Sequence, residues 1–410
     1  KINNDSTTGG NQTYNGPVSL GADATLSSTG NGAIDFLSTV DGAHNLTVNT
    51  GGLTTFGSAV GGTAALTSLI TDTTGTTTLA GNVITTAAQT YGDGVSLSGD
   101  ATLTGTSVSL SSVTGAGNNL TVTGNAVLGG PLSGLATLSI SGTTAFNAGN
   151  VSTTGGQTYG DAVTLGADTT LSSSGNGAID FVSTVNGAHN LTVATGGLTT
   201  FGGAVGGTTA LTSLTTDAAG STRLGGNVTT TGAQTYNDAV TLGGDATLAS
   251  TGSGAIGFGS TVNGAHKLTV NTSGLTTFGG AVGATNALTS LTTDVGGGTS
   301  LGGNVTTSGT QTYGDAVTLG TNAALTGTTV SLAGVTGAGN NLTVTGNAVL
   351  AGVVSGVNAL QISGATSLNT ASVNTSGGQT YSGAVTLGAD TTLASSGSGA
   401  IGFGTTVNGA

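Results

Sequence analysis

The sequence predicts an all-β fold in which short strands wind into a β-solenoid, with coils of about 20 residues. Three observations predict it. The tripeptide QTY recurs along the chain at two fixed intervals, which is typical of a repeat array. Between these tripeptides, short segments alternate apolar residues with Thr or Ser, the pattern of strands with one buried face. Strong helix formers are scarce, because the chain has no Glu, no Met and only three Lys and Arg residues.

The repeats set the organisation of the chain. The QTY tripeptides start at positions 12, 89, 157, 234, 311 and 379, so the successive intervals are 77, 68, 77, 77 and 68. Long and short repeats are therefore mixed in tandem, and we expect them to form one continuous solenoid. The predicted segments are the tail of a preceding repeat (1–11), long repeats (12–88, 157–233 and 234–310), short repeats (89–156 and 311–378) and a truncated long repeat (379–410).

A smaller element recurs within each repeat: an aromatic residue or Leu, followed four positions later by Val. From Tyr14 the next intervals are 22, 20 and 23, and the last one, from Leu79 to Tyr91, is only 12. This short step is either a short coil or one side of a larger coil. We predict that the first residues of these elements form an inward-facing core ladder and not an exposed binding platform. The ladder residues are Tyr14, Phe36, Phe56, Leu79, Tyr91, Tyr159, Phe181, Phe201, Tyr236, Phe258, Phe278, Tyr313, Tyr381 and Phe403.

Energetics favour stacked coils over independent ones. A coil of about 20 residues buries four or five aliphatic side chains, each contributing roughly 1.5–3 kcal/mol. Ordering its backbone costs about 1–2 kcal/mol per residue. A single coil is therefore unstable alone, and stability arises between neighbouring coils.

Charge and composition exclude several classes of function. The formal charge is −13, with sixteen Asp against three basic residues, which argues against binding nucleic acid or anionic lipid. No run approaches the length of about 18 apolar residues that a membrane helix needs, so we expect no membrane insertion of this region. The chain has no Cys, which is compatible with export in an unfolded state. It opens and closes inside a repeat, and we expect it to be an excerpt of a longer protein.

The three histidines occur in one frame, (N/D)GAH(N/K)LTV, at His44, His189 and His266. Neighbouring histidines are separated by at least one long repeat, and thus by three or more coils. A shared metal needs its ligands within roughly 2.0–2.1 Å of one centre, so we predict solvated turn residues and no metal site.

The carboxylates do not suggest a catalytic pair. Asp35, Asp41 and Asp100 are each replaced by Gly or Asn in other copies of the repeat. The Asp residues that persist in a Thr-Asp turn have no evident partner; they are Asp72, Asp217 and Asp294. Those of the GAD or GGD turns supply one carboxylate per coil, too few for calcium; they are Asp23, Asp168, Asp245 and Asp390. We therefore predict no enzyme, no cofactor and no metal.

Two stretches carry a family resemblance. NLTVNTGGLTTFGSAVGG and QTYGDAVTLGADTTL resemble the tandem repeats of large bacterial exoproteins related to filamentous haemagglutinin, which are two-partner-secreted adhesins of Gram-negative bacteria. The resemblance implies a right-handed parallel β-helix, passage through an outer-membrane pore, and a long fibre at the cell surface or in the extracellular matrix. It implies no catalytic residues.

We expect a structural, non-enzymatic extracellular fibre or stalk that supports adhesion, biofilm formation or cell–cell contact. This function allows two kinds of partner: other copies of the chain, through self-association or lateral packing of fibres, and glycans on host or neighbour-cell surfaces. The alternatives are a glycan-binding adhesin module and a functional amyloid subunit, in which many chains stack through steric zippers. An enzyme acting on polysaccharides ranks last, because such enzymes use clustered carboxylates.

Overall fold

The computed structural model describes residues 1–409 and confirms the predicted parallel β-solenoid. Strands and turns make up the described residues, without any helix, and the strand pairs are parallel. By its internal contacts the chain divides into an N-terminal half, Lys1–Gly202, and a C-terminal half, Gly203–Ala410. Each half is described by itself below.

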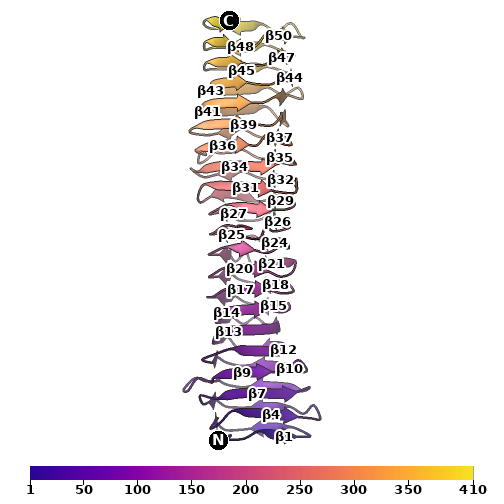
Figure 1. Ribbon diagram of the computed structural model, residues 1–410, viewed down its shortest axis with the longest axis vertical. Helices are drawn as coiled ribbons and strands as arrows, with labels where there is room; N and C mark the ends of the chain where they lie inside the picture. The colour runs from indigo at the N-terminus through magenta and orange to yellow at the C-terminus, as the bar shows by residue number, and fades with distance from the viewer. Residues whose placement is uncertain (410) are drawn as a thin grey trace. The chain divides into compact units, whose positions relative to one another are not determined.

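In the N-terminal half each coil has three sides, and the strands of successive coils form three ladders, named faces A, B and C. Figure 1 shows the stacking, for example of β4, β7 and β9. Face A contains β2 (Gln12–Tyr14), β5 (Ile34–Phe36), β8 (Leu53–Phe56), β10 (Thr76–Leu79), the second part of β12 (Gln89–Leu97), the last part of β13 (Ala101–Thr114), β15 (Leu132–Leu135), β18 (Val151–Thr153), β21 (Thr169–Ser173) and β24 (Asn190–Thr195). Face B contains β3 (Val18–Ser19), β6 (Val40–Asp41), the bridge residue Val60, β11 (Val83–Ile84), the first parts of β13 and β14 (Leu120–Leu128), β16 (Leu138–Ile140), β19 (Gln157–Tyr159), β22 (Ile179–Phe181) and β25 (Leu198–Phe201). Face C contains β1 (Ser6–Thr8), β4 (Ala24–Ser28), β7 (Asn45–Thr50), β9 (Ser68–Thr71), the first part of β12, the middle part of β13, the second part of β14, β17 (Thr144–Phe146), β20 (Val163–Leu165) and β23 (Val185–Asn186).

The C-terminal half also has three ladders, named faces D, E and F. Face D contains β26 (Ser213–Thr216), β29 (Gln234–Tyr236), β32 (Ile256–Phe258), β35 (Leu275–Phe278), β37 (Gly298–Leu301), β40 (Val317–Leu319), β42 (Val335–Thr336), β44 (Val354–Val357), β47 (Ser372–Thr375) and β50 (Thr392–Ser395). Face E contains β27 (Ser221–Leu224), β30 (Ala239–Leu242), β33 (Val262–Asn263), the bridge residue Val282, β38 (Val305–Thr306), the first parts of β41 (Ala323–Leu332) and β43 (Leu342–Leu350), β45 (Leu360–Ile362), β48 (Gln379–Tyr381) and β51 (Ile401–Phe403). Face F contains β28 (Val228–Thr230), β31 (Ala246–Ser250), β34 (Lys267–Thr272), β36 (Ser290–Thr293), β39 (Thr310–Tyr313), the second parts of β41 and β43, β46 (Thr366–Leu368), β49 (Val385–Leu387) and β52 (Val407–Gly409).

Alternation of side chains along each strand builds the core. In β7, with sequence NLTVNT, Leu46, Val48 and Thr50 are buried, and the residues between them are partly exposed. The parallel register then stacks equal positions, so that Leu46 lies between Ala24 and Leu69 of the adjacent coils. Adjacent strands are about 4.8 Å apart, and their inward side chains form continuous columns.

Differences in coil length are absorbed at the corners. Residues 42–44 connect β6 to β7, whereas residues 61–67 connect Val60 to β9 one coil later. Despite the longer corner, β7 and β9 pair in register over four residues. The length of a step therefore affects the surface at a corner and leaves the ladders intact.

The short step from Leu79 to Tyr91 is neither a short coil nor one side of a coil: it covers two of the three sides, from β10 on face A past β11 on face B to the first part of β12 on face C. From β2 to β11 the first long repeat occupies eleven sides, counting the bridge residue Val60, and the short repeat from β12 to β18 also occupies eleven. Eleven sides are three coils plus two sides, so each repeat begins one side earlier than the one before. Tyr14, Tyr91 and Tyr159 consequently lie on faces A, C and B. The C-terminal half shows the same progression from β29 to β39 and β48, on faces D, F and E.

Candidate functional site

In the QTY tripeptide, the Gln and Tyr side chains hydrogen-bond to each other on the inward side of the coil. In all six copies the Tyr hydroxyl donates a hydrogen bond to the Gln Oε1 two residues earlier, at 2.9–3.1 Å. The Gln Nε2 donates in turn to a backbone carbonyl 15 residues later, two sides further along the solenoid, at 2.8–2.9 Å. Burial raises the pKa of Tyr159 well above its usual range, which keeps the hydroxyl protonated as a donor. The motif therefore places two polar groups in the core without leaving either unpaired.

The structure places most of the predicted ladder residues in the core, and many of them in stacks. Tyr159, Phe181 and Phe201 stack with ring centroids 5.3 and 5.1 Å apart. Tyr91 instead pairs in register with Thr71 and Leu110, so its neighbours in the column are not aromatic. The ladder residues at most 1% exposed are Phe36, Phe56, Leu79, Tyr91, Tyr159, Phe181, Phe201, Tyr236, Phe258, Phe278, Tyr313 and Tyr381.

Two predicted ladder residues depart from full burial. Tyr14 is half-buried, although it stacks on Phe36 with ring centroids 5.1 Å apart. Phe403 is 42% exposed and stacks on Tyr381 with one ring face only. Phe403 still continues the inward column of Tyr381, and its exposure arises because no described strand lies beyond β51 on face E to cover its second ring face.

The three histidines are not isolated turn residues, because each lies beside a carboxylate of the preceding coil. His44 Nδ1 is 3.6 Å from Asp23 Oδ1, and the pairs His189–Asp168 and His266–Asp245 have the same separation. The imidazoles are 37–39% exposed. The prediction of a solvated histidine missed this partner, which belongs to the previous coil and is therefore distant in the sequence.

A glycine fixes the corner that carries each histidine. Gly42 has φ +130°, in a region that favours glycine, and a Cβ there would lie 2.5 Å from the carbonyl oxygen of Leu20. Gly187 and Gly264 have φ +131° and +127°. The glycine of the recurring GAH sequence is therefore required by the backbone of the turn.

Asp and Asn at the corners act as hydrogen-bond acceptors between coils. Asp23 Oδ1 accepts from the backbone N–H of Asn45 at 2.9 Å, and Oδ2 accepts from the Asn45 side chain at 2.8 Å. These bonds, aided by His44, hold the pKa of Asp23 below its ordinary value. Asn322 makes the same bond to the N–H of Asn341 that Asp100 makes to that of Asn119. An amide thus replaces a carboxylate freely, which argues that the charge has no chemical task here.

Three buried carboxylates were not anticipated from the sequence. Asp93 is 4% exposed, and its carboxylate accepts hydrogen bonds from Thr71 Oγ1 at 2.8 Å and Thr77 Oγ1 at 2.9 Å. Two further copies repeat the arrangement: Asp238 with Thr216 and Thr222, and Asp315 with Thr293 and Thr299. We call these three clusters the carboxylate stations.

The environment of each station is uncharged apart from a second carboxylate. Burial raises the pKa of Asp93, the two Thr hydrogen bonds oppose that shift, and the charge of Asp72 adds to it. Asp72 was predicted to lack a partner; its Oδ2 accepts from Thr74 Oγ1 at 2.9 Å, but its buried Oδ1 has none. The corresponding Oδ1 atoms of Asp217 and Asp294 are also buried without a partner.

A signal for the stations exists in the sequence but is incomplete. In β12 the alternation from Gln89 to Leu97 places Asp93 on the inward side. The same QTYGD sequence at Gln157 leads to Asp161, which is exposed. The two cases differ in the preceding coil, which supplies the Thr hydroxyls only at the end of a long repeat.

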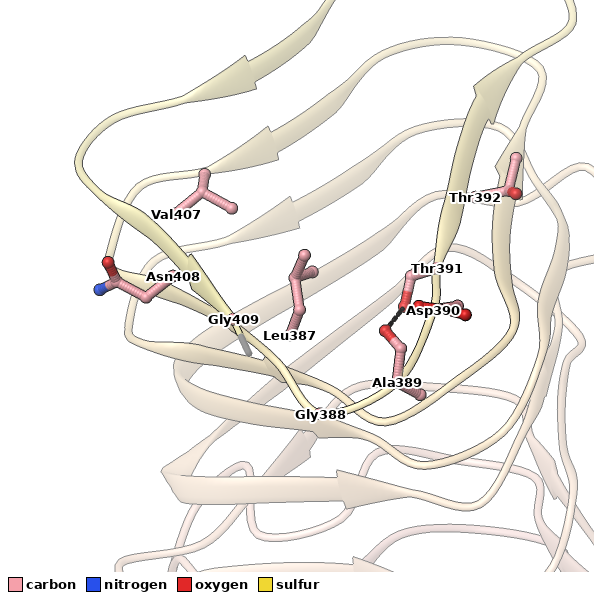
Figure 2. A pocket seen from close by; sticks show the side chains of 9 residues that line it. All are labelled: Leu387, Gly388, Ala389, Asp390, Thr391, Thr392, Val407, Asn408 and Gly409. Carbon is pink, nitrogen blue, oxygen red and sulfur yellow. Dashed lines mark hydrogen bonds between the residues drawn. The ribbon is translucent and has the colours of Figure 1, made fainter.

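A hollow at the C-terminal end of the described residues offers no comparable chemistry. Its volume is about 930 Å³, and Figure 2 shows it between β49, β52 and the turn containing Asp390. Leu387 and Val407 line it, and their counterparts two long repeats and one short repeat earlier, Leu165 and Val185, are almost fully buried. The hollow is therefore a core layer that the described residues leave uncovered, and Asp390 is its one acidic group.

Metal and membrane features can be assessed over residues 1–409. No group of three or more His, Cys, Asp or Glu residues there lies close enough to hold a metal ion. The same residues include no helix able to cross a membrane.

Comparison with known proteins returned no match: no family model, curated protein or solved structure corresponds to this chain. The fold and the stations therefore rest on the chain's own sequence and geometry.

Proposed function

We propose that this chain is a structural, non-enzymatic segment of a bacterial extracellular fibre or stalk, which gives length and rigidity for adhesion, biofilm formation or cell–cell contact. The observation that carries the proposal is the eleven-side repeat. Every repeat reproduces the inward columns, while corresponding outward positions change, as from Asp35 to Gly257. What is kept from copy to copy is the means of stacking one coil on the next.

The same repeat argues for a scaffold over a periodic glycan-binding platform. Because each repeat begins one side earlier, equivalent outward residues of consecutive repeats in one half lie on different faces. A flat strip of identical sites for a linear polysaccharide would require equivalent residues on one face. The location outside the cell is supported by the resemblance to secreted exoproteins, and the absence of Cys is compatible with export in an unfolded state.

The test is the mass per length of the purified chain and its assemblies, measured by scanning transmission electron microscopy. The chain has 410 residues and a mass of 38.2 kDa. With about 20 residues per layer and about 4.8 Å between layers, a single-chain solenoid should have roughly 0.4 kDa per Å.

That value, or a small integer multiple for bundled solenoids, supports the structural proposal. A value unrelated to any multiple would indicate stacking of separate chains as in amyloid. Binding of the isolated chain to defined glycans on an array, retained after outward Thr residues are replaced in one repeat but lost when all are replaced, would favour the adhesin module instead.

A further inference from the structure

The carboxylate stations lie where a long repeat meets the next repeat. Thr71 and Thr77 belong to the last coils of the repeat 12–88. Asp93 lies in β12, between the first and second sides of the repeat 89–156. The other two stations occupy the ends of the repeats 157–233 and 234–310 in the same way. No station forms where a short repeat ends, because Asp161 is exposed and Gly383 has no side chain.

Each station buries negative charge without a cation among the described residues. Two ionisable groups interact electrostatically with Asp93: the carboxylate of Asp72 and the hydroxyl of Tyr91. The Tyr91 hydroxyl donates its hydrogen bond to Gln89 and not to Asp93. Equivalent pairs act at the other stations: Asp217 with Tyr236, and Asp294 with Tyr313. Within residues 1–409, two neutral Thr hydroxyls are the only donors to each buried carboxylate besides its own backbone N–H. A buried carboxylate in such surroundings favours its neutral, protonated form.

Each station also has an excess of acceptors. Asp72 Oδ1 is buried without any hydrogen-bond partner, and so are its two counterparts. A bound proton supplies the station with one more donor and removes the repulsion between the two carboxylates. Both effects stabilise the folded state relative to the unfolded one.

We propose that Asp93, Asp238 and Asp315 are proton-binding sites. Through them, the coils where a long repeat meets the next repeat become more stable as the pH falls from neutral towards about pH 4.

The direction follows from linkage. Burial raises the pKa of each of these carboxyls in the folded state above its unfolded value of about 3.9. The folded state therefore binds more protons, and stability rises as pH falls through the folded pKa, levelling off below the unfolded pKa. One proton per station lowers the local opening constant by at most about tenfold per pH unit.

The experiment compares the triple variant Asp93→Asn, Asp238→Asn and Asp315→Asn with the matched control Asp161→Asn. Opening constants of β12, β29 and β39 are measured by hydrogen exchange between pH 7.5 and 4.5, corrected for the intrinsic exchange rate. We expect the constants to fall with decreasing pH in the wild type and the control, and to stay level in the triple variant. Equal pH dependence in all three proteins would overturn the proposal.

A direct titration keeps the proposal testable if the triple variant does not fold. Wild-type protein labelled with ¹³C at the Asp carboxyl carbons should show three resonances titrating above the ordinary Asp range, each assigned by one single Asn variant. Titration of these resonances at or below about pH 3.9 would refute it. Stabilisation of the wild type by calcium chloride at pH 7.5, absent from the triple variant, would show a cation site and overturn proton binding as the role of the stations.

Discussion

The Gln–Tyr pair of the QTY motif gives the sharpest test of how this core is built. Tyr159 and Gln157 are both fully buried, and the Tyr hydroxyl donates to Gln Oε1 at 2.9 Å. One coil further, the same columns hold Ile179 and Phe181, which are the apolar equivalents of the pair. The chain thus contains its own model of the doubly substituted site.

The magnitudes follow from which group is left unpaired. Tyr159→Phe leaves Gln157 Oε1 buried without a donor, and Gln157→Ile leaves the Tyr159 hydroxyl buried without an acceptor. Each single change should cost about 1–3 kcal/mol of stability. The double variant removes both partners and reproduces the Ile-x-Phe coil, so we expect it to lie within about 1 kcal/mol of the wild type.

Local opening free energies from hydrogen exchange of β19 and β22 are the suitable measurement, since a repeat array need not unfold in one step. Urea unfolding followed by circular dichroism provides the global value. A double variant as unstable as the two single variants added together would refute the reasoning. It would mean that the Gln side chain is required for its bonds to Ser172 O and Thr153 Oγ1, and not for the Tyr hydroxyl.

Three further outcomes are expected. Phe181→Ala, in the centre of a three-ring stack, should cost about 3–5 kcal/mol in urea unfolding, whereas Phe181→Leu should cost less; equal losses would contradict ring packing as the cause. Hydrogen bonds from Asn190 lower the pKa of Asp168 in the folded state. Its contribution to the free energy of unfolding is therefore present above the unfolded pKa and is lost as the pH falls through the folded pKa. Asp168→Asn should remove that acid-induced loss of stability in a series of unfolding curves at different pH. Replacing all three histidines with Gln should leave the circular dichroism spectrum and assembly unchanged, and loss of assembly would show that the His–Asp corners do more than cap a turn.

The sequence was sufficient for the class of fold and the size of the coil, because both follow from period-2 alternation and the repeat length. It was also sufficient for most core positions: Phe36 and Phe56 lie in the core and stack as neighbours at 5.2 Å. It could not show that the short step from Leu79 to Tyr91 covers two of the three sides of a coil. That distinction depends on which strands pair, and pairing is a property of the whole stack.

The station residues could not be predicted from local sequence for a related reason. Asp93 and Asp161 follow the same QTYG sequence, yet one is buried and the other exposed. Their difference comes from Thr71 and Thr77, which precede Asp93 by about one coil and become its neighbours only through the register. The partner of His44 was missed in the same way, since Asp23 belongs to the previous coil.

The eleven-side repeat has a consequence for how such a gene can change. Unequal recombination between two copies of the QTY segment adds or removes a whole number of repeats, and long–short, short–long and long–long junctions all occur already in the chain. The inward columns continue across the junction, because a repeat can begin on any of the three sides. The only change is that the outward residues after the junction move to a neighbouring face, by one side for each repeat gained or lost. Length can therefore vary between descendants without any compensating mutation in the core.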